Sequence, residues 1–426
     1  MTLNLLEELR WRGMLQDSTP GTVDQLNKES TVGYAGFDPT ADSLGIGNMV
    51  PVMLLKRFQL HGHKPIALVG GATGMIGDPS GKSAERNLLS EDVLQHNVES
   101  QKKQLEKFLD FSGSSAAQIV NNYDWFKEIG YLQFLRDVGK HITIAYMMSK
   151  ESVQNRMESG ISYTEFSYQL LQGYDYTVLY KQKNCKLQLG GSDQWGNMVT
   201  GTELVRKIHG GEAHAITCPL VTKADGTKFG KTESGNIFLS AERTSPYKFY
   251  QFWLNAADAD AGRYMRIFTL LGKEEIETLV QQHASAPHQR ALQKTLAQEM
   301  TRMVHSNEDL TFAIEASEIL FGNGTTDALQ RYTPKQIESV FEGIPTATIS
   351  KQELEQGLDA VLLFSDKTGF MASRGEAKRT LQGKGARVNK RVIETVDAKV
   401  SAEALINNRY LLLQKGKKDF FLVIAE

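Results

Sequence analysis

The stretch TVGYAGFDPTADSLGIGN, residues 31–48, decides the fold because an apolar run passes directly into a glycine-punctuated loop and then into a helical pattern. Its first eight residues have the short apolar character of a strand, and the apolar side chains of residues 50–60 recur at helical spacing. At a turn between a strand and a helix, free backbone N–H groups and the helix dipole attract an anion. The stretch therefore predicts a strand, an anion-binding loop and a helix.

The same alternation extends along the first half of the chain. Short apolar runs occupy residues 64–71, 117–125, 186–193 and 213–222, and amphipathic helical patterns occupy residues 91–109 and 195–208. Such alternation indicates a doubly wound parallel sheet, and hence an α/β fold. Beyond about residue 245 the apolar side chains follow helical spacing only, which predicts an all-helical part before a small C-terminal module. We expect the parts to cover residues 1–222, 223–325, 326–350 and 351–426.

Composition narrows the class of protein. The 426 residues have a net charge of -2 and are 41% hydrophobic, which argues against a protein that coats nucleic acid along its full length. The two cysteines, Cys185 and Cys218, predict neither a disulfide framework nor a cysteine-based metal site, and they favour a reducing cytoplasm. No run approaches the eighteen or so apolar residues of a membrane span.

Two further loops contain phosphate-binding signals. Residues 70–86, GGATGMIGDPSGKSAER, end like a Walker A loop, but Ile76 stands where that motif needs glycine. Residues 223–232, KADGTKFGKT, place Lys228 and Lys231 around a glycine, and lysines so placed can meet a polyphosphate. Taken alone, the first loop is equally typical of an ordinary surface turn, and the lysine pair is more typical of a solvated surface.

The histidines predict no metal site. His61 and His63 are two residues apart, but no acidic or cysteine partner is near them in the sequence, so we expect a solvated turn after a helix. The nine histidines also lack the HExxH spacing of a zinc enzyme.

Taken together and in order, the motifs resemble those of a known family. GFDPTAD at 36–42 with Ile46 and Gly47, followed by KFGKT at 228–232, resembles the two signature motifs of class I aminoacyl-tRNA synthetases. The segments NNYDW at 121–125, EFSYQLLQGYD at 165–175 and QLGGSDQWGN at 188–197 resemble the bacterial tyrosyl-tRNA synthetases in particular. The likeness extends from the N-terminus through the C-terminal module.

The resemblance implies a role for each part. It implies a Rossmann-like catalytic domain with a dimerisation insertion at 1–222, the KFGKT loop with an α-helical anticodon-binding domain at 223–325, a linker at 326–350, and a small α+β RNA-binding domain at 351–426, of a type shared with a ribosomal small-subunit protein. It also implies a cytoplasmic homodimer, joined through residues 121–148. The substrates would be L-tyrosine, Mg²⁺-bound ATP and tRNA(Tyr), with no prosthetic group and no membrane.

In the implied reaction, the tyrosine carboxylate attacks the α-phosphate of ATP, and the tyrosyl group then passes to the 3′ end of the tRNA. The residues implied to surround tyrosine are Tyr34, Thr73, Asp78, Asn122, Tyr168, Gln172, Asp175 and Gln194. Among them, Tyr34 and Asp175 would bind the phenolic hydroxyl, and Tyr168, Gln172 and Asp78 the ammonium group. The spacing of 168, 172 and 175 places three of these side chains on one helical face.

The resemblance also assigns the ATP side. Because no enzyme nucleophile is needed, catalysis rests on positioning and on stabilising the charge of departing pyrophosphate. The residues implied at the ATP phosphates are Thr40, Gly47, Asn48, Lys82, Arg86, Lys228, Lys231 and Thr232. Those implied to face the α-phosphate or ribose of the adenylate are Gly36, Asp38, Gln188, Gly191 and Asp193.

One signature motif departs from the family pattern. Gly45 and Asn48 stand where the family usually has two histidines. Asparagine keeps a hydrogen-bonding side chain, but glycine keeps none, and losing a hydrogen bond to a charged group costs roughly 1.5–3 kcal/mol, about ten- to a hundredfold in rate. Three interpretations of Gly45 follow: an engineered variant, a natural form in which Lys82 or the KFGKT loop compensates, or a weakened enzyme. Because every residue of the tyrosine pocket remains, we expect residual activity.

The C-terminal module contains a basic stretch. Residues 366–391 include eight lysines and arginines but two acidic residues, which predicts contacts with tRNA phosphates. The proposed contacts are Arg374, Lys378, Arg379, Lys384, Arg387, Lys390 and Arg391, with Lys415, Lys417 and Lys418 as an extension. A solubilising helix is the alternative explanation.

Two other functions stay open at this point. Gly45 and the basic stretch together are consistent with a disabled relative that serves as an RNA-binding protein. The tryptophanyl enzymes share the expected fold, although the polar pair Tyr34 and Asp175 favours tyrosine.

Overall fold

The computed structural model describes residues 4–80, 89–157, 160–232, 235–322, 326–416 and 419–426. The chain forms two compact units, Met1–Thr244 with Trp253–Val304 and Ser245–Phe252 with His305–Glu426. The four-part division expected from the sequence stays a prediction. Four of the basic residues singled out above, Lys82, Arg86, Lys417 and Lys418, lie outside the described residues.

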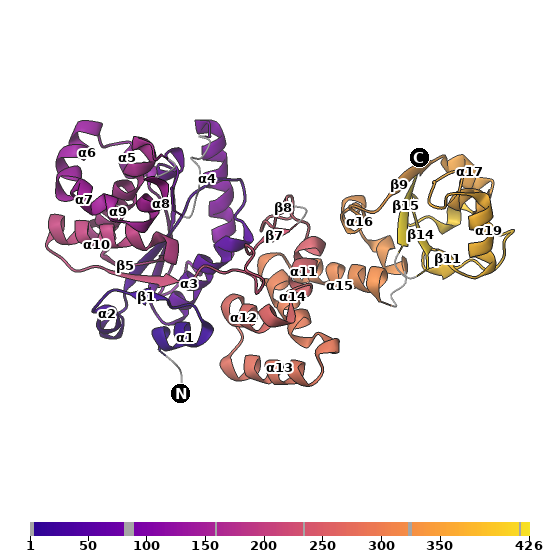
Figure 1. Ribbon diagram of the computed structural model, residues 1–426, viewed down its shortest axis with the longest axis horizontal. Helices are drawn as coiled ribbons and strands as arrows, with labels where there is room; N and C mark the ends of the chain where they lie inside the picture. The colour runs from indigo at the N-terminus through magenta and orange to yellow at the C-terminus, as the bar shows by residue number, and fades with distance from the viewer. Residues whose placement is uncertain (1–3, 81–88, 158–159, 233–234, 323–325, 417–418) are drawn as a thin grey trace. The chain divides into compact units, whose positions relative to one another are not determined.

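A six-stranded sheet organises the first unit (Figure 1). Its strands are β1 (Asp17–Ser18), β2 (Val32–Phe37), β3 (Lys64–Val69), β4 (Gln118–Asn121), β5 (Cys185–Gly191) and β6 (His214–Cys218), in the order β1-β6-β5-β2-β3-β4. All pairs are parallel except β1 with β6, so the predicted parallel sheet is confirmed. β6 ends earlier than predicted, before Pro219, which has no N–H to continue the ladder.

Helices cover both faces of this sheet. Side chains of neighbouring strand residues point to opposite faces. A Cβ on Gly33 would lie 2.8 Å from the Phe58 ring, so α3 (Met49–Leu60) approaches one face closely. The next residue, Tyr34, packs edge-on against Tyr176 of α9 (Tyr163–Lys183), 5.3 Å between ring centroids, and α10 (Trp195–His209) packs beside α9. The sheet is therefore doubly wound.

The order of the strands locates a topological switch point. From β2 the chain continues outward through β3 and β4, and it then returns to add β5 and β6 on the other side of β2. In open parallel sheets, ligands bind at the carboxyl ends of the two strands where the order reverses. A ligand site is therefore expected where β2 and β5 end.

The other helices of the first unit are α1 (Leu5–Arg12), α2 (Thr22–Lys28), α4 (Glu91–Leu105), α5 (Tyr123–Phe126), α6 (Tyr131–Asp137), α7 (Ile144–Met148), α8 (Glu151–Met157), α12 (Asp258–Phe268), α13 (Lys273–Ser285) and α14 (Ala291–Val304). A short hairpin, β7 (Lys231–Thr232) and β8 (Gly235–Asn236), follows β6. The predicted helix at 91–109 ends four residues early, because the N–H groups of Lys107 and Phe108 bond three residues back.

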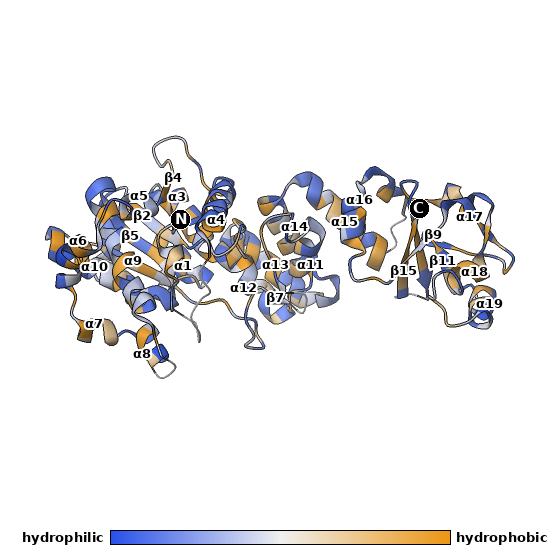
Figure 2. Ribbon diagram, turned by 90° about the horizontal axis from the view of Figure 1, so that it is seen from above, coloured by the Kyte–Doolittle hydropathy of each residue, from blue (hydrophilic) through white to orange (hydrophobic). Residues whose placement is uncertain are grey.

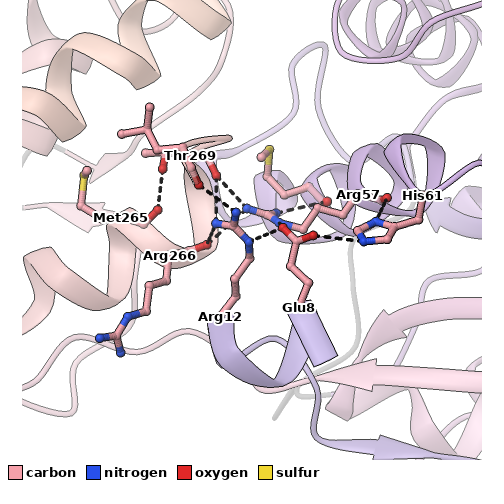
Figure 3. Close-up of polar contacts among 9 residues, drawn as sticks. Glu8, Arg12, Arg57, His61, Met265, Arg266 and Thr269 are labelled. Carbon is pink, nitrogen blue, oxygen red and sulfur yellow. Dashed lines mark hydrogen bonds and ion pairs between the residues drawn. The ribbon is translucent and has the colours of Figure 1, made fainter. Parts of the chain in front are cut away.

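Charged side chains fasten the N-terminal helix to α3 and α12 (Figure 3). A Glu8 oxygen lies 2.6 Å from Arg12 Nε, and the buried Arg57 side chain lies beside them. Arg12 and Arg57 both donate to the carbonyl oxygen of Arg266, and Arg57 also donates to that of Thr269. The two guanidinium groups thereby satisfy carbonyls that the end of α12 leaves without helical partners.

The two histidines follow α3 in a turn, as expected, but the expectation of a solvated turn is wrong for His63. His61 Nε2 lies 3.2 Å from a Glu8 oxygen, so an acidic partner is present. His63 is buried rather than solvated: its Nδ1 accepts the N–H of Thr31 at 3.2 Å, and its ring stacks on Phe58. Burial lowers the pKa of His63 to about 4. The contacts with Glu8 and Thr31 join segments that are distant in sequence, which is why sequence spacing missed them.

The second unit combines helices with a five-stranded sheet. The helices are α15 (Asn307–Phe321), α16 (Pro334–Val340), α17 (Lys351–Glu355), α18 (Ala360–Phe364) and α19 (Arg374–Gln382), with α11 (Pro246–Leu254) running from this unit into the first. The sheet has the order β12-β11-β14-β15-β9, from β9 (Thr346–Ile349), β11 (Ala386–Val388), β12 (Arg391–Val392), β14 (Tyr410–Lys415) and β15 (Asp419–Ala425), and β10 (Leu358–Asp359) pairs with β13 (Lys399–Val400).

Residues 326–350, expected as a linker, contain regular structure. They include α16 and the edge strand β9, which pairs in parallel with β15. Ile337 and Val340 of α16 are buried in a cluster with Leu412 and Leu422 of the sheet. Within the described parts of the chain, no helix is long and apolar enough to cross a membrane.

Candidate active site

A tyrosine side chain and a carboxylate lie buried together between β2 and α9. Tyr34 is 1% exposed, and its hydroxyl has no hydrogen-bond partner among the described residues. Asp175 is equally enclosed, and its two oxygens accept hydrogen bonds from Asn122 Nδ2 at 3.1 Å and Trp125 Nε1 at 2.9 Å. The structure therefore brings together the two residues expected to bind a phenolic hydroxyl.

Burial controls the protonation of this pair. It raises the pKa of Asp175 to about 8, although the hydrogen bonds from Asn122 and Trp125 act in the opposite direction. Burial first, and then the Asp175 charge, raise the pKa of Tyr34 well above its usual value. Tyr34 is therefore a neutral hydroxyl with an unused donor beside the carboxyl oxygens of Asp175, which can accept, and a phenol can use both.

A second carboxylate, Asp38, is held in place by two hydroxyl groups. Tyr168 Oη donates to Asp38 Oδ2 and Thr73 Oγ1 donates to Asp38 Oδ1, each at 2.8 Å. A Cβ on Gly70 would lie 2.2 Å from Asp38 Oδ1, so only glycine lets the carboxylate sit there. Asp38 was expected at the adenylate, but its side chain contacts two residues expected around tyrosine. Negative charge at this position favours a cation such as an ammonium group.

Asn122 links the two carboxylates. This residue is fully buried, and its Nδ2 donates both to Asp175 and to Thr73 Oγ1, the latter at 3.0 Å. Its Oδ1 accepts the N–H of Ala72 at 2.7 Å. A chain of hydrogen bonds thus runs from Asp175 through Asn122 and Thr73 to Asp38, which makes the geometry of one end depend on the other.

A second polar network joins the loop after β3 to the helix after β5. Gln194 Nε2 donates to Asp78 Oδ2 at 2.7 Å. Asn197 Nδ2 lies 3.0 Å from Gln172 Oε1 and 3.3 Å from Gln194 Oε1. The three residues expected at the ammonium end or near it, Asp78, Gln172 and Gln194, are therefore connected through Asn197.

Two functional candidates were missed in the sequence. Trp125 fixes the Asp175 carboxylate, and the buried Asn197 joins Gln172 to Gln194. Both end quoted motifs, NNYDW and QLGGSDQWGN, so their positions were the available signal.

Glycines occupy the ends of β2 and β5. A Cβ on Gly36 would meet nothing within 4 Å, whereas one on Gly191 would lie 2.5 Å from Asp193 Oδ1. Gln188 of β5 is buried, and its Oε1 has no hydrogen-bond partner among the described residues. Gly36, Gln188 and Gly191, all expected at the adenylate, therefore lie on the two strands of the switch point.

The altered signature motif has an extended backbone at Gly45. Its φ of -80° suits any residue, and an added Cβ would meet Asn48 Oδ1 and the carbonyl oxygen of Ile237 at an ordinary 3.7 Å. Asn48 Oδ1 accepts the N–H of Gly45 at 3.0 Å, so that oxygen is engaged within the motif. The site consequently has room for a larger side chain at position 45.

The KFGKT loop is fastened at its centre and exposed at its lysines. Phe229 is buried and stacks on Phe268 of α12, 5.1 Å between centroids. Gly230 has a φ of +81°, and a Cβ there would lie 2.6 Å from Ile46 Cγ2, so the loop rests directly on the other signature motif. Lys228 and Lys231 are exposed on either side. The two signature motifs therefore meet, as a shared ligand requires.

The remaining ATP-side candidates are partly described. Thr40 is exposed, and its N–H donates to the carbonyl oxygen of Asp38 at 2.8 Å. A Cβ on Gly47 would meet nothing within 4 Å. The Thr232 hydroxyl donates to the carbonyl oxygen of Gly235 at 3.0 Å. The structure says nothing of Lys82 and Arg86, which lie outside the described residues.

In the second unit, most of the basic candidates already have a polar partner. Arg374 pairs with Asp366, Lys384 with Glu394, and Arg391 with Asp327. Arg387 donates to the Gly416 carbonyl, and the Lys390 ammonium lies 5.1 Å from the Phe420 ring centroid. Lys378 and Arg379 are exposed on α19. These two have the charges most available to an anionic partner.

A turn of unusual backbone geometry presents Lys390. Asn389 and Lys390 connect β11 to β12 with φ values of 50° and 65°. Two left-handed residues match the twist of a tight hairpin, which usually contains asparagine followed by glycine. Lysine at the second position is therefore costly for the fold, and such costs concentrate at functional positions.

Comparisons with known proteins agree with this geometry. The family described as "tRNA synthetases class I (W and Y)" matches residues 26–322, and the "Tyrosine--tRNA ligase SYY-like C-terminal domain" matches residues 336–423. The tyrosine–tRNA ligases of Bacteroides thetaiotaomicron and Cytophaga hutchinsonii are 58% and 57% identical to the chain, over 100% and 99% of both proteins.

The folds agree as well. A C-terminally truncated mitochondrial tyrosyl-tRNA synthetase of Aspergillus nidulans superposes with a TM-score of 0.67 and 29% identity, over 73% of this chain and 92% of that one. Nothing in these comparisons favours a disabled RNA-binding relative. The chain therefore belongs to the tyrosine and tryptophan group of class I tRNA synthetases, and within that group to the tyrosine–tRNA ligase family.

Proposed function

We propose that the chain activates tyrosine with ATP and transfers the tyrosyl group to tRNA at the site between β2, β5 and α9. The observation on which this rests is the buried pair of Tyr34 and Asp175, with one unused hydroxyl donor and a carboxyl group whose oxygens can accept. A phenolic hydroxyl satisfies both groups. Phenylalanine would leave them unpaired in a buried place, at a cost of about 1–3 kcal/mol for each group.

The ammonium group of the substrate would bind beside Tyr168 and Asp38, with Gln172 and Asp78 nearby. Tyr168 and Thr73 orient the Asp38 carboxylate, which supplies the negative charge. Binding at both ends fixes the tyrosine so that its carboxylate projects towards the glycines at the ends of β2 and β5. Such fixation lowers the entropic part of the barrier to attack.

In the first step, a tyrosine carboxylate oxygen forms a bond to the α-phosphorus of ATP, and the bond from that phosphorus to the β-phosphate oxygen breaks. Pyrophosphate leaves with the electron pair. Lys228 and Lys231, together with Lys82 and Arg86, would stabilise its charge. In the second step, a terminal hydroxyl of tRNA attacks the tyrosyl carbonyl, and AMP leaves.

Magnesium would accompany ATP rather than occupy a site of its own. In the described residues, no group of three or more histidine, cysteine or acidic side chains could hold a metal ion. Its main ligands would be phosphate oxygens and water, which is how Mg²⁺ usually accompanies nucleotides.

Tyrosine-dependent exchange of pyrophosphate into ATP tests this proposal. We expect exchange with tyrosine and far less with phenylalanine or tryptophan. Replacing Asp175 with alanine should abolish the preference for tyrosine over phenylalanine. Exchange that is equal for the three amino acids, or absent with all of them, would contradict the proposal.

The functional assembly would be a homodimer formed through α6, α7 and the start of α9. Large apolar side chains are exposed there, with Leu132 at 79%, Ile144 at 68% and Tyr163 at 63%, and Figure 2 shows α7 as mostly hydrophobic. Exposed apolar residues gathered in this way mark protein interfaces. In sedimentation experiments, Leu132→Asp should convert a dimer of the wild-type chain into a monomer, and a monomeric wild type would contradict this part.

A further inference from the structure

Helix α4 has three amide side chains on one face, at positions 97, 101 and 104. Spacings of four and three residues align side chains along a helix. Asn97 and Gln101 are 4% and 2% exposed, so these are not surface amides, and Gln104 is half-buried beside them. Buried amides require polar partners, and their partners reveal what the helix face is for.

All three amides bind one loop, residues 39–44, which lies between β2 and the Gly45 motif. Asn97 Nδ2 donates to the carbonyl oxygen of Pro39, and Gln101 Nε2 donates to that of Ala41, each at 3.0 Å. Gln104 Oε1 accepts the N–H of Leu44 at 2.8 Å. The contacts advance along the loop as the amides advance along the helix. We call Asn97, Gln101 and Gln104 the amide ladder.

The loop depends on such partners because it has no regular secondary structure. Its backbone groups would otherwise need water or remain unpaired. It also contains Thr40, an expected phosphate contact, and it leads directly into Gly45. The positions of Thr40 and Gly45 therefore depend on the hydrogen bonds that the amide ladder makes to this loop.

The other side of the same loop is bonded to the segment that follows the KFGKT loop. The N–H of Ser240 donates to Ser43 Oγ at 3.1 Å, and Gln104 Nε2 donates to that same oxygen at 3.0 Å. The N–H of Leu239 donates to the carbonyl oxygen of Leu44 at 2.9 Å. Ser43 is 2% exposed. Helix α4, residues 39–44 and residues 239–240 thus form one hydrogen-bonded unit.

We propose that the amide ladder is a positioning device for the activation step, and that Gln101 and Gln104 are its principal members. They touch no substrate; they hold residues 39–44 so that Thr40 and the following motif face the ATP phosphates beside the KFGKT loop. The inference rests on the proposed function. It adds that α4 links residues 39–44 to residues 239–240, which follow the KFGKT loop, whereas the hydrogen bonds of Gln101 and Gln104 do not involve Tyr34, Tyr168 or Asp175.

Methionine in place of each glutamine tests this, because it keeps the length of the side chain but removes its hydrogen bonds. We expect Gln101→Met and Gln104→Met to slow single-turnover formation of tyrosyl-adenylate about five- to thirtyfold. The apparent affinity for ATP should also fall. The dissociation constant for tyrosine should not change. The control is Gln95→Met, an exposed amide of the same helix bonded to Glu99, which should behave as wild type.

Hydrogen exchange of the backbone gives a readout that is independent of activity. Residues 39–44 should exchange faster in Gln104→Met, whereas α9 should not change. Unchanged exchange in this loop would overturn the inference, and so would losses of tyrosine affinity and Tm that parallel the loss of rate. If wild type forms no adenylate but the variant loosens this loop, the amide ladder stands as its anchor and the proposed function falls.

Discussion

At the scale of single residues, Gly45 is a missing side chain in a place that can hold one. Its extended backbone carries no strain that requires glycine, and the nearest atoms leave ordinary van der Waals room. The neighbouring Asn48 oxygen is bonded to the N–H of Gly45, so it does not replace the lost group. That this site lacks a phosphate contact stays a prediction, and the structure shows only that a larger side chain would fit there.

Gly45→His should accelerate the formation of tyrosyl-adenylate about ten- to a hundredfold, because an added donor could bond a phosphate oxygen in the transition state. Tyrosine binding should remain nearly unchanged, since Tyr34 and Asp175 lie on other elements. Single-turnover rates and equilibrium titration measure the two quantities. A variant with no gain in rate would show that position 45 is not a phosphate contact here.

Asp175 predicts a dependence of stability on pH. Its pKa is about 8 in the folded protein, against an ordinary value of 3.8. Between these values the folded state binds the additional proton, so the free energy of unfolding falls as the pH rises, by up to about 1.4 kcal/mol per pH unit. The contribution is fully present below pH 3.8 and is lost as the pH rises through 8.

Calorimetry at pH 5.5 and pH 7.5 checks this expectation without ligand. The Tm of Asp175→Asn should fall less than that of wild type between the two values, because asparagine does not titrate. Asp124→Asn, a change at an exposed aspartate, serves as the control and should follow wild type. Equal pH dependence in all three proteins would be incompatible with a raised Asp175 pKa.

At the scale of elements, α12 is the support of the KFGKT loop. Asp260 Oδ2 accepts the N–H of Ala224 at 3.0 Å, and Arg263 donates to the carbonyl oxygen of Thr222 and to Asp260. Phe229 adds an aromatic anchor on Phe268. Since the end of α12 is itself bonded to Arg12 and Arg57, the loop is supported as far back as the N-terminal helix (Figure 3).

Phe229→Leu should weaken this anchor and slow the activation step at least fivefold, because Lys228 and Lys231 lose their fixed positions. Tyrosine affinity should persist. Phe108 is 6% exposed, as Phe229 is, and Phe108→Leu makes the same change of side chain. This variant therefore controls for general destabilisation. Similar losses of activation rate in both variants would mean that the effect is one of stability alone.

At the scale of the whole molecule, the second unit contains the basic residues proposed to contact tRNA. Partners within that unit already engage Arg374, Lys384 and Arg391, whereas Lys378 and Arg379 are exposed on α19. The RNA-binding surface is therefore expected to depend most on these last two.

The double variant Lys378→Ala with Arg379→Ala should raise the KM for tRNA severalfold and reduce the salt dependence of tRNA binding by about two phosphate contacts. Pyrophosphate exchange, which needs no tRNA, should equal that of wild type. Lys335→Ala, another exposed lysine of the same unit, is the matched control. An unchanged salt dependence would remove α19 from the tRNA surface.

How much the sequence could predict follows from the range of the interactions. Alternating apolar patterns are local, so they predicted β2 to β6 and the helices α3, α4 and α10. The motif resemblance also placed Tyr34, Asp175 and Tyr168 in one pocket. The strand β9 and the partners of His61 and His63 depended on distant contacts, whereas α4 ended in local hydrogen bonds to residues three positions back. These were the features that the sequence missed.

The sequence by itself determined the parallel sheet, the polar residues at the ends of its strands and the family of the chain. Only the tertiary structure decided that Trp125 and Asn122 enclose Asp175, and that the amide ladder holds residues 39–44. Asn122 and Asp175 are 53 residues apart, and Gln104 and Leu44 are 60 apart. No local pattern specifies such pairs, because a buried polar group finds its partner only when the sheet brings remote segments together.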